Sequence, residues 1–144
     1  IMTIRVIAGI AVVLTAACAA AEVRIEAGWV RAMPPVATTT AGYARLVNTG
    51  DQPVAIQAAP VDWAGGAALH EMATADDGTS TMRHLDQVQL APGATLELAP
   101  GGQHLMFTEL ERVPSAGDRV RVCFRFDAES SCRDFPVRRS APDE

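Results

Sequence analysis

The sequence lacks the short motifs on which most enzyme classes depend. It contains no G-x-S-x-G nucleophile elbow and no glycine-rich phosphate-binding loop, and its single His-Glu pair continues as "HEM" at His70 rather than as H-E-x-x-H. It also shows no recognisable Ser, His and Asp grouping for nucleophilic catalysis. We therefore expect a protein that is not an enzyme.

The chain is also poor in charge, and the charge that it has is mainly negative. Of its 144 residues, 20% are charged and 49% are hydrophobic, and the formal net charge is -5 at pH 7. A chain of this size and composition suits one globular domain with a sizeable core. Because an acidic domain repels a phosphate backbone, nucleic acid is not an expected partner.

Helical periodicity is missing as well, since no such pattern is sustained over three turns. Short apolar runs are instead separated by glycine, proline and asparagine turns. The predicted strands are 23–31, 42–48, 54–58, 67–72, 81–88, 95–98, 104–108, 119–126 and 133–137, with short helical turns near 61–65. Eight or nine strands at this spacing predict an all-β fold, an antiparallel β-sandwich of Greek-key type.

Residues 1–21 are typical of a secretory signal peptide, with a basic start at Arg5, an apolar run and a cluster of small residues. The run is short for a membrane span, which needs about 20 apolar residues. Cleavage after Ala21 would leave a domain at 22–137 and a disordered tail at 138–144. We therefore expect a periplasmic protein.

Lipid attachment at Cys18 is the less favoured alternative. A bacterial lipobox has leucine three residues before the cysteine, whereas this chain has Thr15 there and Leu14 one residue further away. Contact with a membrane is expected only if Cys18 carries a lipid.

Export changes how the remaining two cysteines are interpreted, because an oxidising compartment favours a disulfide over free thiols. Apolar residues alternate with polar ones through 119–126, which predicts a half-buried strand. If the chain reverses near Asp127 and Ala128, Cys123 faces Cys132 across a hairpin. Such a disulfide would stabilise the fold by about 2 to 3 kcal/mol. A two-thiolate metal site is the alternative.

Histidine and methionine occur in pairs, although the chain has only three histidines and five methionines. In each pair the residues are two apart on a predicted strand, so both side chains point to the same face. The pairs are His70 with Met72, Met82 with His84, and His104 with Met106, and Met33 stands apart. A single pair would be ordinary core filler or surface, but three together predict a metal site.

Neutral thioether and imidazole ligands suit Cu(I) better than hard ions such as magnesium or calcium. Zinc sites favour thiolate, imidazole and carboxylate over thioether. A blue-copper electron carrier would need a cysteine thiolate followed closely by histidine and methionine, which the segment 123–132 does not contain. Copper storage, transport or delivery is therefore favoured, and a secreted structural sandwich with no metal role is the competing class.

These residues resemble the periplasmic copper chaperone family called PCu(A)C. The family pattern is a histidine, eleven residues, a methionine, twenty-one residues, and then histidine, any residue, methionine, which His70, Met82, His104 and Met106 match. Flanking segments such as "GWVRAMPP" at 28–35 and "LAPGATLELAPGGQHLMF" at 90–107 are similar too.

The resemblance implies a cupredoxin-like β-sandwich that binds Cu(I) through those four residues, with Met72 and His84 as auxiliary candidates. The family commonly has methionine where His84 stands, so the role of His84 stays open. It also implies copper delivery to the CuA centre of cytochrome c oxidase, with an oxidase subunit or a Sco-type protein as recipient. Copper buffering is the alternative role, and we expect a monomer.

Overall fold

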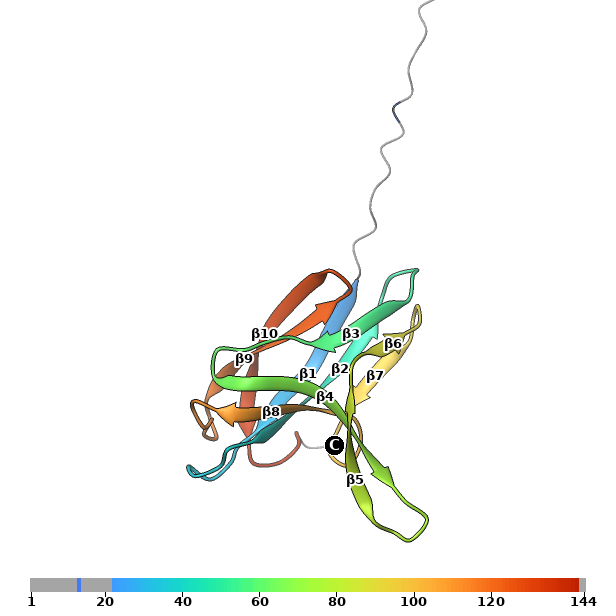
Figure 1. Cartoon of the computed structure of the whole chain (residues 1–144). Coiled ribbons are helices and arrows are strands. Elements are labelled where there is room, and N and C mark those ends of the chain that lie inside the picture. Colours follow the sequence, from blue (N-terminus) through green and yellow to red (C-terminus); the bar gives the residue numbers. More distant parts are fainter. Residues whose placement is uncertain (1–12, 14–21, 143–144) are drawn as a thin grey trace, which may run out of the picture.

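The computed structural model describes Val13 and residues 22–142, which form an all-β domain (Figure 1). These residues contain no helix long and apolar enough to cross a membrane. Most of the segment 1–21, with Cys18 and the expected cleavage site, lies outside the described residues, as do 143–144. The described strands are β1 (Val23–Arg31), β2 (Thr40–Asn48), β3 (Val54–Ala58), β4 (Ala64–Thr74), β5 (Ser80–Leu85), β6 (Val88–Leu90), β7 (Thr95–Leu98), β8 (His104–Leu110), β9 (Arg119–Phe126) and β10 (Glu129–Arg138).

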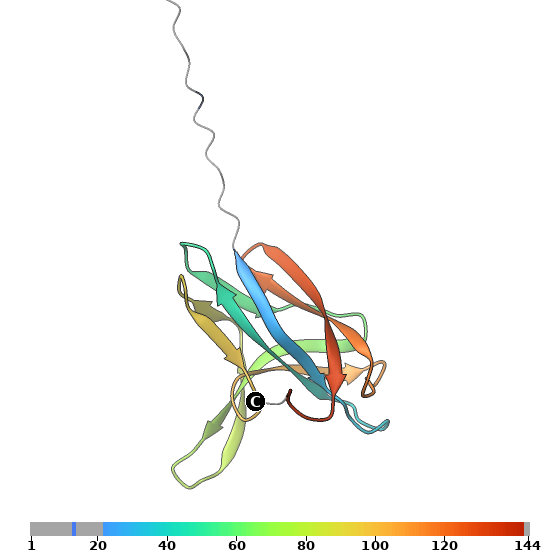
Figure 2. The same cartoon turned by 180° about the vertical axis from the view of Figure 1, so that it is seen from behind.

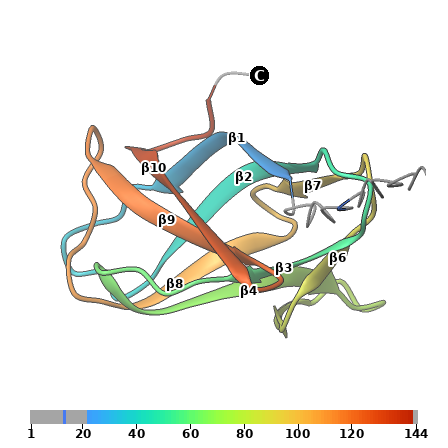
Figure 3. The ribbon, with the colours of Figure 1, turned by 90° about the horizontal axis from the view of Figure 1, so that it is seen from above.

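The strands follow the order β5-β4-β8-β2-β1-β10-β9-β3-β6, and β7 pairs with β2 beside this path. The pairing of β1 with β10 is parallel, and the other described pairings are antiparallel. β2 pairs with β8 through its first residues and with β7 further along. Viewed from above, the sheet folds over so that β1, β2 and β7 face β3, β4 and β6 (Figure 3). The predicted all-β sandwich is confirmed.

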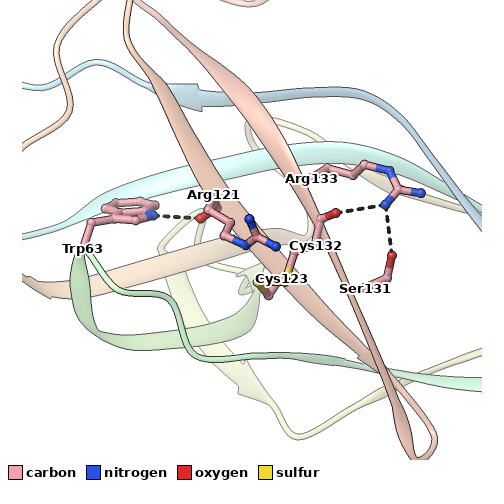
Figure 4. Close-up of a disulfide and its surroundings, with 6 residues drawn as sticks. All are labelled: Trp63, Arg121, Cys123, Ser131, Cys132 and Arg133. Carbon is pink, nitrogen blue, oxygen red and sulfur yellow. Dashed lines mark hydrogen bonds between the residues drawn. A yellow bond between two sulfur atoms is a disulfide. The ribbon is translucent and has the colours of Figure 1, made fainter.

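The core lies between these two layers. Leu46 of β2, Leu105 of β8 and Phe124 of β9 are each fully buried. Trp63 packs against Phe107 with ring centroids 4.5 Å apart and the ring planes tilted by 45°. The Trp63 indole N–H donates a hydrogen bond of 2.8 Å to the Arg121 carbonyl, which ties the start of β4 to β9 (Figure 4). Burial of these large side chains supplies the main stabilising term of the fold.

The hairpin β9–β10 has the predicted chain reversal and cysteine pairing, but β10 is longer than the predicted strand 133–137 and includes Arg138, which was expected in the disordered tail and instead pairs with Arg31. The chain turns at Asp127, whose φ is 53°, and Cys132 lies directly opposite Cys123. The two cysteines form a disulfide that joins β9 to β10 (Figure 4).

Several strands are longer than predicted, and two predictions about the elements themselves were wrong. The predicted strand 81–88 is two strands, because β5 ends at Leu85 and β6 begins at Val88. β5 pairs with β4 and β6 with β3, so the chain crosses between the two ends of the sheet order there. Neither a glycine nor a proline marks this change of partner, which falls at two successive polar residues, Asp86 and Gln87. The expected helical turns near 61–65 are instead a tight turn at Asp62 and Trp63, followed at once by β4.

A bulge in β1 shapes one wall of the site described below. Between the pairs Glu26–Arg45 and Trp29–Tyr43, β1 has one residue more than β2, and Ala27 adopts a φ of 50°. Gly28 is needed there because a Cβ would lie 2.5 Å from the ring of Phe135. The bulge brings Trp29 against Tyr43, with ring centroids 4.6 Å apart.

Candidate metal centre

Three neighbouring strands, β5, β4 and β8, carry all three histidines of the chain. His70 on β4 lies opposite His84 on β5 and opposite His104 on β8. Directly opposed residues of an antiparallel pair point to the same face, so the imidazoles form one row. The ring centroid of His70 lies 5.5 Å from that of His84 and 6.0 Å from that of His104.

Methionines widen this row into a patch. Met72 lies opposite Met82, and each is two residues from a histidine on its own strand. Met106 lies opposite Ala68 on one side and Ala41 on the other, and these small neighbours leave space around its thioether. We call the patch the His/Met face, and it consists of His70, Met72, Met82, His84, His104 and Met106.

The opposite face of the same strands is part of the core. Leu69 and Leu105 oppose each other and are 1% and 0% exposed, and Phe107 is 1% exposed. The alternation in the sequence therefore has two consequences. Its apolar members fix β4 and β8 in the sandwich, and the histidines and methionines between them are held on the other side.

Exposure increases across the His/Met face from β8 to β5. His104 is buried, with 5% of its surface exposed, and His70 and Met72 are half-buried. Met82 is 46% exposed, and His84 is exposed as well. A metal ion held here would therefore be shielded on the β8 side and open to an incoming partner on the β5 side.

A surface pocket of about 320 Å³ opens beside this face. Met72, Met82, His104 and Met106 contribute to its lining, and Met33 joins them from the loop after β1. The pocket therefore gathers every methionine of the described residues, whereas the sequence pattern left Met33 apart. Met33 has no histidine two residues away, so no local signal could have identified it.

The two inner histidines are held in different ways. The Nδ1 of His104 lies 3.0 Å from the Gly102 carbonyl oxygen, to which a protonated Nδ1 donates. This bond orients the ring and leaves the lone pair on Nε2 for a metal. Gly101, with a φ of 82°, makes the tight turn before β8 possible.

His70 has a buried ring nitrogen, Nδ1, that has no hydrogen-bond partner among the described residues. Burial lowers the pKa of His70 below its ordinary value of 6.5, and the neighbouring His104 and His84 lower it further. The imidazole is therefore neutral at pH 7, which is the form that binds a metal. An unsatisfied buried nitrogen is costly, and a metal bond is one way to satisfy it.

The donor set fits a soft, monovalent metal. Over the described part of the chain, no group of three or more His, Cys, Asp or Glu side chains is placed to hold a metal ion. What the His/Met face provides is imidazole nitrogen together with thioether sulfur, which suits Cu(I). The predicted ligands His70, Met82, His104 and Met106 lie on this face, with the auxiliary Met72 and His84 beside them. Their role as ligands stays a prediction.

Comparisons with known proteins agree with this picture. The sequence model of the family described as "LpqE-like: Putative lipoprotein LpqE-like" matches residues 23–137. "Putative lipoprotein Lxx21020" of Leifsonia xyli subsp. xyli (strain CTCB07) is 32% identical over 118 residues, which cover 81% of this chain and 69% of that protein.

Solved structures of similar proteins, PCuAC domains among them, have the same fold. The solution structure of CuI-DR1885 from Deinococcus radiodurans is 26% identical, with a TM-score of 0.64 over 84% of this chain and 82% of that one. The copper-bound PCuAC domain from PmoF2 is 23% identical, with a TM-score of 0.65 over 85% of this chain and 97% of that one, and this likeness concerns the fold alone.

Proposed function

The chain belongs to the LpqE-like family and has the fold of PCuAC domains, and we propose that it is a periplasmic metallochaperone that carries one Cu(I) ion. The resemblance to PCu(A)C proteins and the cupredoxin-like fold predicted from the sequence are both confirmed. Copper is the cargo of such a protein rather than a resident cofactor. No chemical step on a substrate is part of the proposal.

One observation carries the proposal. Two imidazoles and two thioethers lie on one face of β4, β5 and β8, although they are up to 36 positions apart in the sequence. They belong to His70, Met82, His104 and Met106. The family pattern requires only the spacing, whereas the register of three strands puts the four side chains on one face, and three of them, Met82, His104 and Met106, line one pocket. The copper-bound state of the relative from Deinococcus radiodurans supports the choice of metal.

The site suits a carrier because its donors are neutral and unequally exposed. Neutral ligands hold Cu(I) without a cysteine thiolate, which an oxidising compartment would consume in disulfides. Release would proceed by ligand substitution, in which thiolates or thioethers of a recipient replace the ligands one at a time. We propose a Sco-type protein or the CuA-bearing subunit of cytochrome c oxidase as the recipient.

The proposed location is outside the cytoplasm. Residues 1–21 have the pattern of an export signal, and the family and its relative from Leifsonia are both described as lipoproteins. These descriptions favour lipid attachment at Cys18 more strongly than the sequence alone does. Membrane fractionation of cells that express wild type or Cys18→Ser tests this, because a lipid anchor predicts that the variant moves to the soluble fraction.

The first experiment is a titration of the purified chain with Cu(I) under reducing conditions, against a competing Cu(I) indicator. We expect one tightly bound ion. His104→Ala combined with Met106→Ala should weaken binding at least about 100-fold, since loss of mere supporting contacts to metal ligands already costs 10 to 100-fold. Wild type with no binding above the nonspecific background would refute the proposal.

A second measurement separates delivery from buffering. The Cu(I)-loaded chain is mixed with an apo CuA domain or a reduced Sco-type protein, and the copper content of each is followed. Transfer faster than release into buffer supports a chaperone. Transfer no faster than spontaneous release supports a copper-buffering role instead.

A further inference from the structure

The β4–β5 hairpin carries a complete set of soft donors by itself. His70 opposes His84, and the next pair on the same face is Met72 with Met82. We propose that His70, Met72, Met82 and His84 form a second, solvent-facing Cu(I) position, through which copper leaves the protein. It shares His70 and Met82 with the site of the proposed function, on which this inference rests.

The register of the hairpin places these four donors within reach of one ion. Opposed residues have Cβ atoms about 4.5 to 5.5 Å apart. The His70 and His84 ring centroids are 5.5 Å apart. The two pairs are successive on one face, so the four side chains occupy neighbouring positions above β4 and β5.

The turn and the opposite face of the hairpin hold this register. Asp77 accepts hydrogen bonds from the Thr79 amide and hydroxyl at 2.9 and 2.6 Å, and Gly78 adopts a φ of 84°. On the other face, Arg83 forms an ion pair with Glu71, which lies directly opposite. The turn and this ion pair therefore help to align the donor pairs from within the hairpin itself.

The hairpin is also the part of the site that a recipient reaches first. Its outer portion projects away from the sandwich in two opposite views (Figures 1 and 2). Every residue of β5 except Leu85 is exposed, whereas His104 on β8 is buried. A copper ion bound by His84 and Met72 would lie further from the core than one bound by His104 and Met106.

His84 has the environment of a metal-binding histidine. Its Nε2 lies 3.2 Å from a carboxylate oxygen of Asp86, to which a protonated Nε2 donates. That bond leaves the lone pair of the neutral ring on Nδ1. Histidine ligands commonly donate their other ring N–H to a carboxylate in this way, which fixes the ring and raises its basicity.

The transfer is a ligand exchange in which no electron or proton moves. The bonds from copper to the His70 nitrogen and the Met82 sulfur persist. Bonds to the His104 nitrogen and the Met106 sulfur break, and bonds to the His84 nitrogen and the Met72 sulfur form. Copper remains Cu(I) throughout, and it keeps at least two protein ligands at every stage.

The test compares two double variants in the purified chain. Met72→Leu with His84→Gln removes the donors that belong only to the hairpin position, and His104→Gln with Met106→Leu removes those of β8. The β8 variant should retain weak Cu(I) binding that disappears when all four changes are combined. The hairpin variant should release Cu(I) to a competing chelator about tenfold more slowly. Thr81→Ala, on the opposite face of β5, is the matched control and should transfer copper at the wild-type rate.

A measurement on wild type avoids any effect of the substitutions on folding. With methionines labelled by ¹³C in the methyl group, Cu(I) should shift the Met72 signal as well as those of Met82 and Met106. An unmoved Met72 signal, together with a β8 variant that binds no Cu(I), overturns the hairpin position and leaves the proposed function standing. Wild type that binds no Cu(I) overturns both.

Discussion

Two antiparallel hairpins of the described residues, β9–β10 and β4–β5, differ in burial, in crosslinking and in the side chains that they carry. In β9–β10 the side chains of Val120, Val122, Phe124 and Phe126 are buried, and a disulfide joins the two strands. In β4–β5 the outer strand is exposed and its partner carries half-buried donors. The first hairpin packs along the body, and the second projects from it (Figures 1 and 2).

The difference separates stability from function. Burial of apolar side chains and a crosslink both lower the free energy of the folded state relative to the unfolded chain. Metal exchange instead needs donors that are accessible and able to move. The fold therefore places the crosslink and a row of buried side chains on β9–β10, and it places four of the six soft donors on β4–β5, whose strand β5 is exposed except at Leu85.

The largest expected effect is a loss of stability when a buried side chain of β9–β10 is removed. Phe124 is 0% exposed, and Phe124→Ala should lower the free energy of unfolding by about 3 to 5 kcal/mol because it leaves a cavity. Met82→Ala, at a position 46% exposed, should change it by about 0.5 kcal/mol or less. Urea unfolding of the apo protein measures both. Equal losses for the two variants would show that the hairpins do not differ in this way.

A smaller loss is expected from removal of the disulfide. Cys123→Ser with Cys132→Ser should lower the free energy of unfolding by about 2 to 3 kcal/mol, the value for a loop of this length. Cu(I) affinity should stay at the wild-type value, because the disulfide lies on strands that carry no proposed ligand. Urea unfolding and the Cu(I) titration test the two halves of the prediction, and loss of copper binding in a folded variant would contradict it.

The smallest expected effect is a pH dependence of stability that arises from His70 in the hairpin β4–β5. The pKa of His70 is lowered in the folded protein by burial and by its histidine neighbours, so the unfolded chain binds its proton more readily. The contribution of His70 to stability is therefore full above its ordinary pKa of 6.5 and is lost as the pH falls from there through the lower folded pKa.

His70→Gln isolates this contribution from those of other titrating groups. Stability of the apo protein, measured by urea unfolding at pH 7.5 and pH 5, should fall less in the variant than in wild type. Cu(I) binding by wild type should weaken over the same interval, since protons compete for the imidazoles. Identical pH slopes for variant and wild type would argue that the His70 pKa is not lowered by the fold.

Local patterns were sufficient for much of the fold. Alternation of apolar and polar residues located β1, β3, β7 and β9 at their observed bounds, because each strand has one face in the core. The break at Asp86 and Gln87 was missed, because the chain changes partner strands there without a glycine or proline to mark it. The disulfide between Cys123 and Cys132 could also be predicted, from the expected export to an oxidising compartment and the short chain reversal between the two cysteines.

For the candidate site, the spacing of residues in the sequence identified candidate ligands, and the register of the strands brought them to the same face. The two-residue spacing placed His104 and Met106 on one face, and the family pattern singled out His70 and Met82. Neither could show that Met33 lies in the same pocket, since that depends on where the loop after β1 packs. The burial of His104 and the exposure of Met82 were also beyond a local pattern.

The sequence by itself determined which donors the protein has, that they lie on strands, and that the core residues between them point the other way. These are local properties, because the alternation of side chains along a strand follows from backbone geometry. Only the tertiary structure decided that β4 lies between β5 and β8, which makes one row of His84, His70 and His104. Strand order depends on contacts between distant segments, and these are chosen by burial of the whole core rather than by any single segment.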